Sequence, residues 1–215
     1  EMQRSLVGSE MCIRDRDETT YFQTLPDRKG YNLLHLNAFY DLCSRQYTDA
    51  IIQPSRLANE RRAMCEMIDR YNDTSAIFIA DRGYENYNIF AHVEHKGMYY
   101  LIRVKDITSN GITSKLTMLP ESGEFDEWVN VTLTKKQTNE VKANPKKYRV
   151  IDKKTPFDYL DLHFNNFYEM KMRVIRFPIP QGSYECIITN LPQDKFNSDE
   201  IKRLYAKRWG IETSF

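Results

Sequence analysis

Most of the chain from Asp17 onward shows a regular period in its hydrophobic and polar positions, and the period predicts the type of element. Alternation, or a short apolar run between turn residues, predicts strands over 32–41, 47–53, 76–80, 98–104, 128–134, 168–174 and 184–191. Helical spacing predicts helices over 57–71 and 86–95. Ser198, which two acidic residues follow, predicts the N-cap of a last helix. This order indicates a mixed α/β fold.

Residues 106–182 differ from the segments on either side, because their strands alternate more strictly. In Tyr168–Val174 the apolar residues share one face, while Glu169, Lys171 and Arg173 share the other. We therefore predict an antiparallel β-rich insertion over 106–182 that lies outside the main sheet. It would separate two parts of an α/β core, 17–105 and 183–215.

Two acidic residues occupy positions that suit metal chemistry. Asp81 directly follows the apolar run 76–80, and Glu212 ends a Y-x-x-R-x-x-x-E pattern with Tyr205 and Arg208. On one continuous helix, Tyr205, Arg208 and Glu212 would share a stripe. Carboxylates on separate elements, with an arginine and a tyrosine beside one of them, suit metal-assisted chemistry on a phosphodiester. The structural alternatives are a helix-capping Asp81 and a surface pair between Arg208 and Glu212.

The net charge does not indicate a partner, but the distribution of charge along the chain does. Lys and Arg total 31 and Asp and Glu total 30, so the net charge of +1 argues neither for nor against nucleic acid. Between Asn130 and Pro180, however, eleven basic residues face five acidic ones. Adjacent lysines in this stretch are candidate phosphate contacts, with a plain solvated surface as the alternative: Lys135 and Lys136, Lys146 and Lys147, Lys153 and Lys154.

The four cysteines are scattered without a C-x-x-C pair, which argues against a disulfide framework and a zinc site. This cysteine usage predicts a reducing, cytoplasmic location. No apolar run approaches the length of a membrane span, so we expect no membrane partner.

The predicted order of elements resembles the RNase H-like nucleotidyltransferase core: a hairpin, a helix, a strand that ends in Asp81, a β-rich segment and a carboxylate-bearing helix. With the motifs added, the chain resembles the DDE transposases of insertion sequences, of the insertion-sequence-four type with its Y-R-E-K signature. The matching residues are Asp81-Arg-Gly-Tyr84, Tyr205, Arg208 and Glu212, and segments 37–41 and 59–62 are also similar. The resemblance extends from about Asp17 to Phe215.

The resemblance implies an RNase H-like fold, with a mixed sheet flanked by helices and interrupted by the β-rich insertion. It implies cut-and-paste movement of DNA by hydrolysis and strand transfer, with two Mg²⁺ ions, or Mn²⁺, held by Asp81 and Glu212. Tyr205 and Arg208 would contact the DNA backbone near the cleaved end. The implied partners are double-stranded DNA, as terminal inverted repeats and target, and a second copy in a synaptic homodimer.

The resemblance also involves two signature residues, the first catalytic Asp and a Lys, that fall outside the matching positions of this chain. The resemblance places the first catalytic Asp on a strand upstream of Tyr21, which would pair between the hairpin and the strand 76–80. It places the signature Lys seven residues after Glu212. Residues 5–16 resemble a translated sequencing adapter, and we interpret 1–16 as a non-native segment, with a short native strand as the alternative. We therefore expect this chain to be an inactive fragment with two unpaired sheet edges.

Two other functions stay open. One is a catalytically dead DNA-binding remnant, and the other is a different RNase H-like nuclease, such as a resolvase. The catalytic interpretation predicts that the carboxylates of Asp81 and Glu212 lie roughly 4–8 Å apart, within reach of a shared metal pair.

Overall fold

The computed structural model describes residues 18–23, 25, 27–161, 166–180 and 182–212, and for residues 211–212 it describes only the backbone. The interpretation of residues 1–16 therefore lies outside the described residues. The chain divides into two compact units, one that ends at Arg70 and one that begins at Tyr71. This division does not test the boundaries predicted after residues 16, 105 and 182, which stay predictions.

The first unit is a β-hairpin with a helix that packs on both of its strands. Its elements are β1 (Tyr21–Phe22), β2 (Tyr31–Asn32), β3 (Leu34–Asp41), β4 (Gln46–Pro54), the 3-10 helix η2 (Ser55–Leu57) and α1 (Glu60–Arg70). The antiparallel pairing of β3 with β4 confirms the predicted hairpin.

Helix α1 begins later than the predicted start at residue 57. Residues 55–57 form η2 instead, and the side chain of Asn59 caps α1, because its Oδ1 accepts a hydrogen bond from the Arg62 N–H at 3.0 Å.

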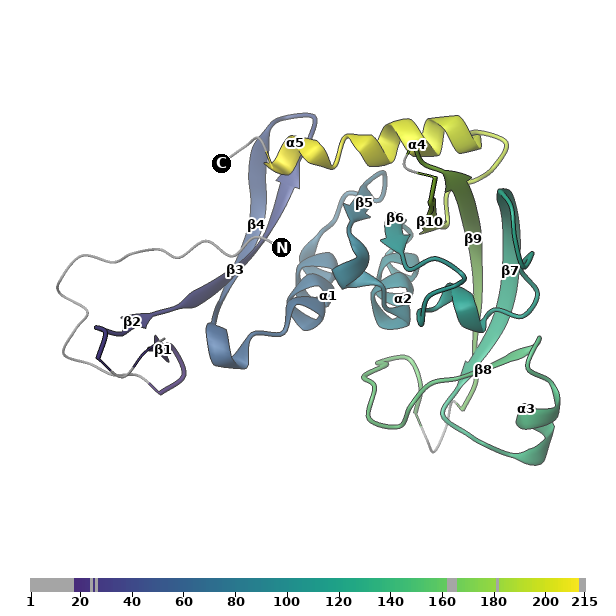
Figure 1. Cartoon of the computed structure of the whole chain (residues 1–215), viewed down its shortest axis with the longest axis horizontal. Coiled ribbons are helices and arrows are strands. Elements are labelled where there is room, and N and C mark those ends of the chain that lie inside the picture. Colours follow the sequence, from purple (N-terminus) through teal and green to yellow (C-terminus); the bar gives the residue numbers. More distant parts are fainter. Residues whose placement is uncertain (1–17, 24, 26, 162–165, 181, 213–215) are drawn as a thin grey trace. The chain divides into compact units, whose positions relative to one another are not determined.

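The second unit is built on one six-stranded sheet with the strand order β5-β6-β10-β9-β7-β8 (Figure 1). Its strands are β5 (Ile77–Ala80), β6 (Tyr99–Val104), β7 (Phe125–Thr134), β8 (Tyr148–Val150), β9 (Tyr168–Pro178) and β10 (Tyr184–Thr189). β5 is parallel to β6 and β7 to β8, while the other neighbours are antiparallel. A mixed sheet of this kind is compatible with an RNase H-like fold.

Within residues 106–182, β7 and β9 are antiparallel while β8 is parallel to β7, and the structure does not place these strands in a sheet of their own. β7 pairs with β9, and β9 pairs with β10, so they continue the sheet that starts with β5 and β6. The physical reason is that β9 is buried on both faces. Its side chains Met170, Met172 and Val174 are buried on one face, and Ile175 and Phe177 are buried on the other. Such a strand belongs inside a covered sheet.

Helices lie on both faces of this sheet (Figure 1). The helical elements are η3 (Arg82–Tyr84), α2 (Tyr87–His95), η4 (Thr113–Lys115), α3 (Asn139–Ala143), α4 (Ser198–Ala206) and α5 (Trp209–Glu212). On the α2 face, the Phe90 ring stacks on Tyr100 at 4.8 Å between centroids. Within the described part of the chain, the helices are too short or too polar to cross a bilayer.

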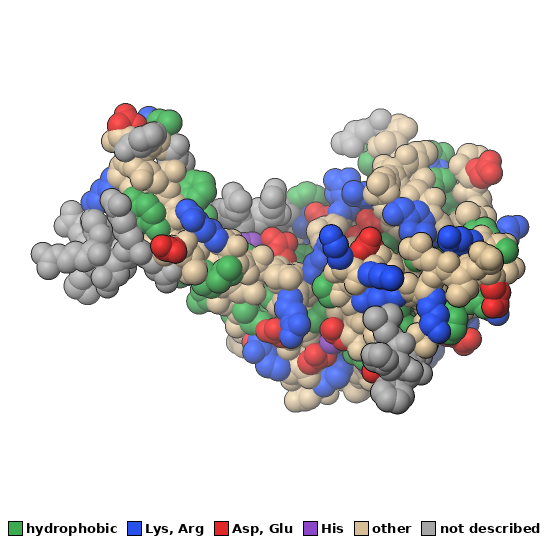
Figure 2. Space-filling view, turned by 90° about the horizontal axis from the view of Figure 1, so that it is seen from below, with side chains coloured by type: hydrophobic (Ala, Val, Ile, Leu, Met, Phe, Trp, Pro, Cys, Tyr) green, Lys and Arg blue, Asp and Glu red, His purple; other side chains and the backbone are tan. Residues whose placement is uncertain are grey.

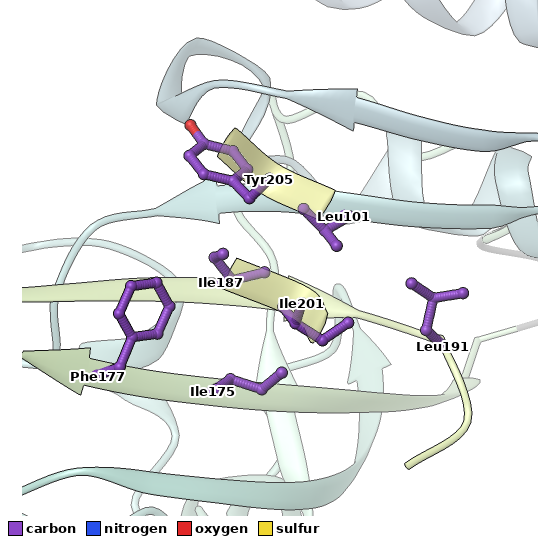
Figure 3. Packing of buried hydrophobic residues seen from close by; sticks show 7 residues of the cluster. All are labelled: Leu101, Ile175, Phe177, Ile187, Leu191, Ile201 and Tyr205. Atoms are coloured by element: carbon purple, nitrogen blue, oxygen red, sulfur yellow. The ribbon is translucent and has the colours of Figure 1, made fainter. Parts of the chain in front are cut away.

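Helix α4 covers the opposite face through a buried apolar cluster (Figure 3). Ile201 and Tyr205 of α4 pack on side chains that three strands and the turn after β10 contribute: Leu101, Ile175, Phe177, Ile187 and Leu191. This packing fixes α4 over the part of the sheet formed by β6, β10 and β9, next to the end of β5.

Among the described residues, β5 pairs only with β6, and β3 pairs only with β4. Each of these strands therefore keeps one backbone edge without a described partner. The resemblance implies one further strand between them, and that strand stays a prediction.

Glu94 on α2 gives the second unit a pH-dependent stability. Its carboxylate accepts a hydrogen bond from the Tyr100 hydroxyl at 3.2 Å, and burial raises its pKa from 4.5 to about 7. A raised pKa in the folded state favours folding below pH 4.5, and this contribution is lost as the pH rises through 7. The wild-type chain should therefore lose up to about 3 kcal/mol of unfolding free energy between these pH values, and Glu94→Gln should not show this loss.

Urea denaturation at a series of pH values checks this prediction. The wild-type chain should become less stable relative to Glu94→Gln as the pH rises, and the exposed Glu121→Gln should follow the wild type. Parallel pH profiles for the wild type and Glu94→Gln would contradict the prediction.

Candidate active site

Asp81 lies where β5 ends, at the edge of the sheet that α4 covers. Its Oδ1 accepts a hydrogen bond from the Arg82 N–H at 2.6 Å and so caps η3. The capping alternative is therefore present in the structure, and the Asp81 side chain is 39% exposed; the catalytic role of Asp81 stays a prediction.

Two charged residues that the sequence did not single out, Arg103 and Glu185, complete the surroundings of Asp81. Arg103 Nε lies 3.0 Å from Asp81 Oδ1, and Arg103 Nη1 lies 3.0 Å from Glu185 Oε1. Arg103 is on β6 and Glu185 is on β10, so three neighbouring strands contribute to one charge network. The sequence signal that could have identified Arg103 is a charged residue in an otherwise apolar strand, since it lies between Ile102 and Val104.

Tyr205 brings helix α4 into this network. The side chain is 5% exposed, and its hydroxyl has no hydrogen-bond partner among the described residues. The pKa of Tyr205 is raised to about 12, mainly by burial and in addition by the charge of Asp81, while Arg103 and Arg208 oppose the rise. Tyr205 and Asp81 therefore influence each other electrostatically, and their proposed roles in catalysis stay predictions.

The helix that carries Tyr205, Arg208 and Glu212 is not continuous, since a short turn divides it into two helices, and the predicted common stripe of the three side chains stays a prediction. α4 ends at Ala206 and α5 begins at Trp209. The turn between them has tighter, three-residue hydrogen bonds, from Arg208 N–H to Tyr205 O at 2.9 Å and from Gly210 N–H to Lys207 O at 2.8 Å.

The structure describes the side chain of Arg208 but not that of Glu212. The Arg208 guanidinium lies 4.6 Å from the centroid of the Trp209 ring and 5.8 Å from that of Tyr205. Trp209 is 56% exposed, so it is not a core residue. The Glu212 side chain lies outside the described residues, and its predicted distance to Asp81 stays a prediction.

A buried ion pair anchors the start of α4. Arg173 Nε and Nη2 donate to Asp126 at 2.6 and 2.5 Å, and Arg173 Nη1 donates to Phe196 O at 2.6 Å. Asp126 also accepts a bond from the Ser198 hydroxyl at 2.7 Å. Arg173, which the sequence places on the polar face of its strand, is therefore buried, because α4 and the segment before it cover that face of β9.

Ser198 is correspondingly not the N-cap of α4. Asn197 fills that role, because its side chain accepts hydrogen bonds from the N–H groups of Asp199 and Glu200, and Glu200 bonds back in a capping box. The predicted position of the helix start was thus wrong by one residue.

Two of the candidate phosphate contacts, Lys136 and Lys147, lie over neighbouring aromatic rings. Lys136 Nζ lies 5.8 Å from the centroid of the Phe167 ring, and Lys147 Nζ lies 5.0 Å from that of Tyr148. The two rings are 5.7 Å apart, so they connect the lysine pairs into one surface at the strands β7 and β8. We call this the lysine surface: Lys135, Lys136, Lys146, Lys147, Tyr148 and Phe167.

The basic excess between residues 130 and 180 is smaller at the surface than in the sequence. Arg173 and Arg176 are buried and pair with Asp126 and Asp106, both outside that stretch. On the face that Figure 2 shows, Lys and Arg side chains are numerous over the second unit, and acidic ones lie between them.

The described residues do not by themselves fit a centre for two divalent ions. Asp81 and Glu185 are the acidic residues of the network, and both bind Arg103. In the described part of the chain, no group of three or more His, Cys, Asp or Glu side chains is placed to hold a metal ion. Two ions would need more oxygen ligands than these carboxylates supply.

Comparison with known proteins adds one match. The model of a family described as the transposase DDE domain matches residues 14–215, a range that includes Asp81, Tyr205, Arg208 and Glu212. No curated protein matches the chain.

Proposed function

The chain belongs to the family of transposase DDE domains, and from this premise we propose that it is a DNA transposase of the insertion-sequence-four type. Such an enzyme would move an insertion sequence by phosphodiester hydrolysis and strand transfer. The observation that supports this proposal beyond the family match is the position of Asp81 at the end of β5, within electrostatic reach of Tyr205.

The proposed roles follow the sequence prediction. Asp81 and Glu212 would be ligands of Mg²⁺ or Mn²⁺, together with further oxygen ligands that the described residues do not include. When bound, the metal would supply charge stabilisation at the cleaved phosphate. The described geometry supports no individual step through it.

Tyr205 and Arg208 would position the DNA backbone next to these carboxylates. A guanidinium binds phosphate with two parallel hydrogen bonds, and the half-buried Arg208 lies in the turn directly after α4. The Tyr205 hydroxyl is a donor that still lacks a described partner, but it is buried, so a contact with DNA would require it to become exposed.

The proposed partner is double-stranded DNA, as terminal inverted repeats and target, bound by a synaptic homodimer. The lysine surface supports a contact to phosphates, because it combines exposed cations with accessible aromatic rings. Proteins that bind phosphate in this way lose affinity steeply with salt.

A second candidate function is a DNA-binding remnant without catalysis. The ion pair of Asp81 with Arg103, and the lack of a three-ligand metal group among the described residues, favour it for this chain. We therefore expect residues 1–215 to bind DNA but not to cut it.

An assay of supercoiled plasmid with Mg²⁺ or Mn²⁺ tests both functions. The expected result is DNA binding without nicking. In a chain whose residues 1–16 are replaced by a native segment that bears the first acidic residue, nicking should appear. Asp81→Ala or Glu212→Ala should then lower its rate by at least about 10³-fold, because a metal ligand is removed.

Two outcomes would contradict these expectations. Metal-dependent nicking by the 215-residue chain that Asp81→Ala eliminates would show that this chain is not inactive. Nicking in the extended chain that survives Asp81→Ala would contradict the proposed role of Asp81.

A further inference from the structure

Arg103 holds two carboxylates with one side chain. Its Nε binds Asp81 Oδ1 and its Nη1 binds Glu185 Oε1, each at 3.0 Å. The two contacts differ in their access to solvent, since the Asp81 side chain is 39% exposed and that of Glu185 is 19% exposed. The contact to Asp81 is therefore the one that a solvent ion reaches first.

The strand register fixes this arrangement. Ile102 of β6 pairs with Ala80 of β5, which places Arg103 beside the residue after β5, namely Asp81. On the other side, Arg103 pairs with Ile187 of β10, and Glu185 lies two positions away on the same face. Because β6 lies between β5 and β10, the guanidinium of Arg103 reaches a carboxylate on each side.

Asp81 binds these groups through one oxygen. Oδ1 accepts from both the Arg82 N–H and Arg103 Nε, so among the described contacts Oδ2 is the oxygen that a cation can approach. The carboxylates of Asp81 and Glu185 with the single guanidinium leave the network one negative charge in excess. Tyr205, whose buried hydroxyl lacks a described partner, faces the same charges.

We propose that Arg103 is the built-in cation of this site: it holds the Asp81 carboxylate in place through Oδ1, and its positive charge weakens the binding of a divalent ion at Asp81. Arg103 is thus a positioning residue, and its pairing with Asp81 opposes metal binding at that carboxylate. This inference rests on the proposed role of Asp81 as a metal ligand. The network of Asp81, Arg103 and Glu185 does not fit a two-metal centre, and this observation motivates the inference.

Electrostatics gives the expected size of the effect. Removing the guanidinium takes one positive charge away from a place a few ångströms from the incoming ion, and in a partly exposed site this changes affinity by about tenfold or more. Arg103→Gln should therefore bind Mn²⁺ at least about tenfold more tightly than the wild type. Arg103→Lys should give a smaller gain, because a lysine is a point charge that cannot bridge both carboxylates.

The experiment titrates Mn²⁺ alone into the whole 215-residue chain and measures free Mn²⁺ by electron paramagnetic resonance. Asp81→Asn, alone and combined with Arg103→Gln, identifies the binding that depends on Asp81. Arg82→Gln is the matched control, because it removes an exposed arginine next to Asp81 without removing the Asp81 ion pair. Circular dichroism checks that each variant is folded, and Arg103→Lys replaces Arg103→Gln if the latter unfolds.

The outcomes separate this inference from the proposed function. Tighter binding in the Arg103 variants that Asp81→Asn removes, with little change in Arg82→Gln, supports the inference. Asp81-dependent binding of equal or lower affinity in the Arg103 variants overturns it and leaves Asp81 as a metal ligand. Binding that never depends on Asp81, in the wild type or in the variants, overturns both.

Discussion

Asp126→Ala is expected to lower the free energy of unfolding by about 3–5 kcal/mol, because it leaves the buried guanidinium of Arg173 without its carboxylate. Asp126 accepts hydrogen bonds from Nε and Nη2 of that guanidinium and from the Ser198 hydroxyl. Its loss should therefore also loosen α4, the helix that carries Tyr205. Chemical denaturation measures the stability, and proteolysis in the loop before α4 measures the loosening.

Two comparisons sharpen this expectation. Asp199→Ala removes an acidic residue from the first turn of α4 whose side chain is 76% exposed, and it should cost less than about 1 kcal/mol. The double variant Asp126→Leu with Arg173→Met replaces both charges by apolar groups and should recover most of the loss. A loss in Asp126→Ala as small as that in Asp199→Ala would contradict the anchoring role.

Replacing the four lysines of the lysine surface by glutamine should weaken binding to a short random-sequence DNA duplex by about 100-fold at low salt. The physical reason is that each phosphate contact releases condensed counterions, and each lost contact should lower the salt slope by about one. Fluorescence anisotropy between roughly 50 and 200 mM salt measures both quantities.

Four lysines from other parts of the chain provide the control, and their replacement by glutamine should change affinity much less: Lys29, Lys96, Lys115 and Lys195. Equal losses in the two variants would show that only net charge matters. That result would contradict a localised phosphate-binding surface.

The period of the sequence predicted the local elements because each depends on neighbours in the chain. The hairpin of β3 and β4, the helix α2 and the strand before Asp81 all lie close to their predicted positions. The short elements α3 and β8 were not predicted, since their few residues show no clear period.

The sheet topology could not be predicted in the same way. Alternation in β9 placed apolar residues on one face and charged residues on the other, yet Arg173 on the charged face is 0% exposed. Alternation reports the polarity of a face but not what covers it. A buried, fully paired arginine has the same sequence signal as an exposed one.

At the candidate site, the sequence alone determined that Asp81 follows a strand, that Tyr205, Arg208 and Glu212 share a motif, and that the chain resembles a transposase. Only the tertiary structure decided that Arg103 and Glu185 surround Asp81, that Arg173 anchors α4, and that the last helix breaks after Ala206. For the first two findings, the physical reason is that the contacts join segments far apart in the chain, such as Arg103 and Glu185, which are 82 residues apart. Strand register and packing create such pairs, and no local period encodes them.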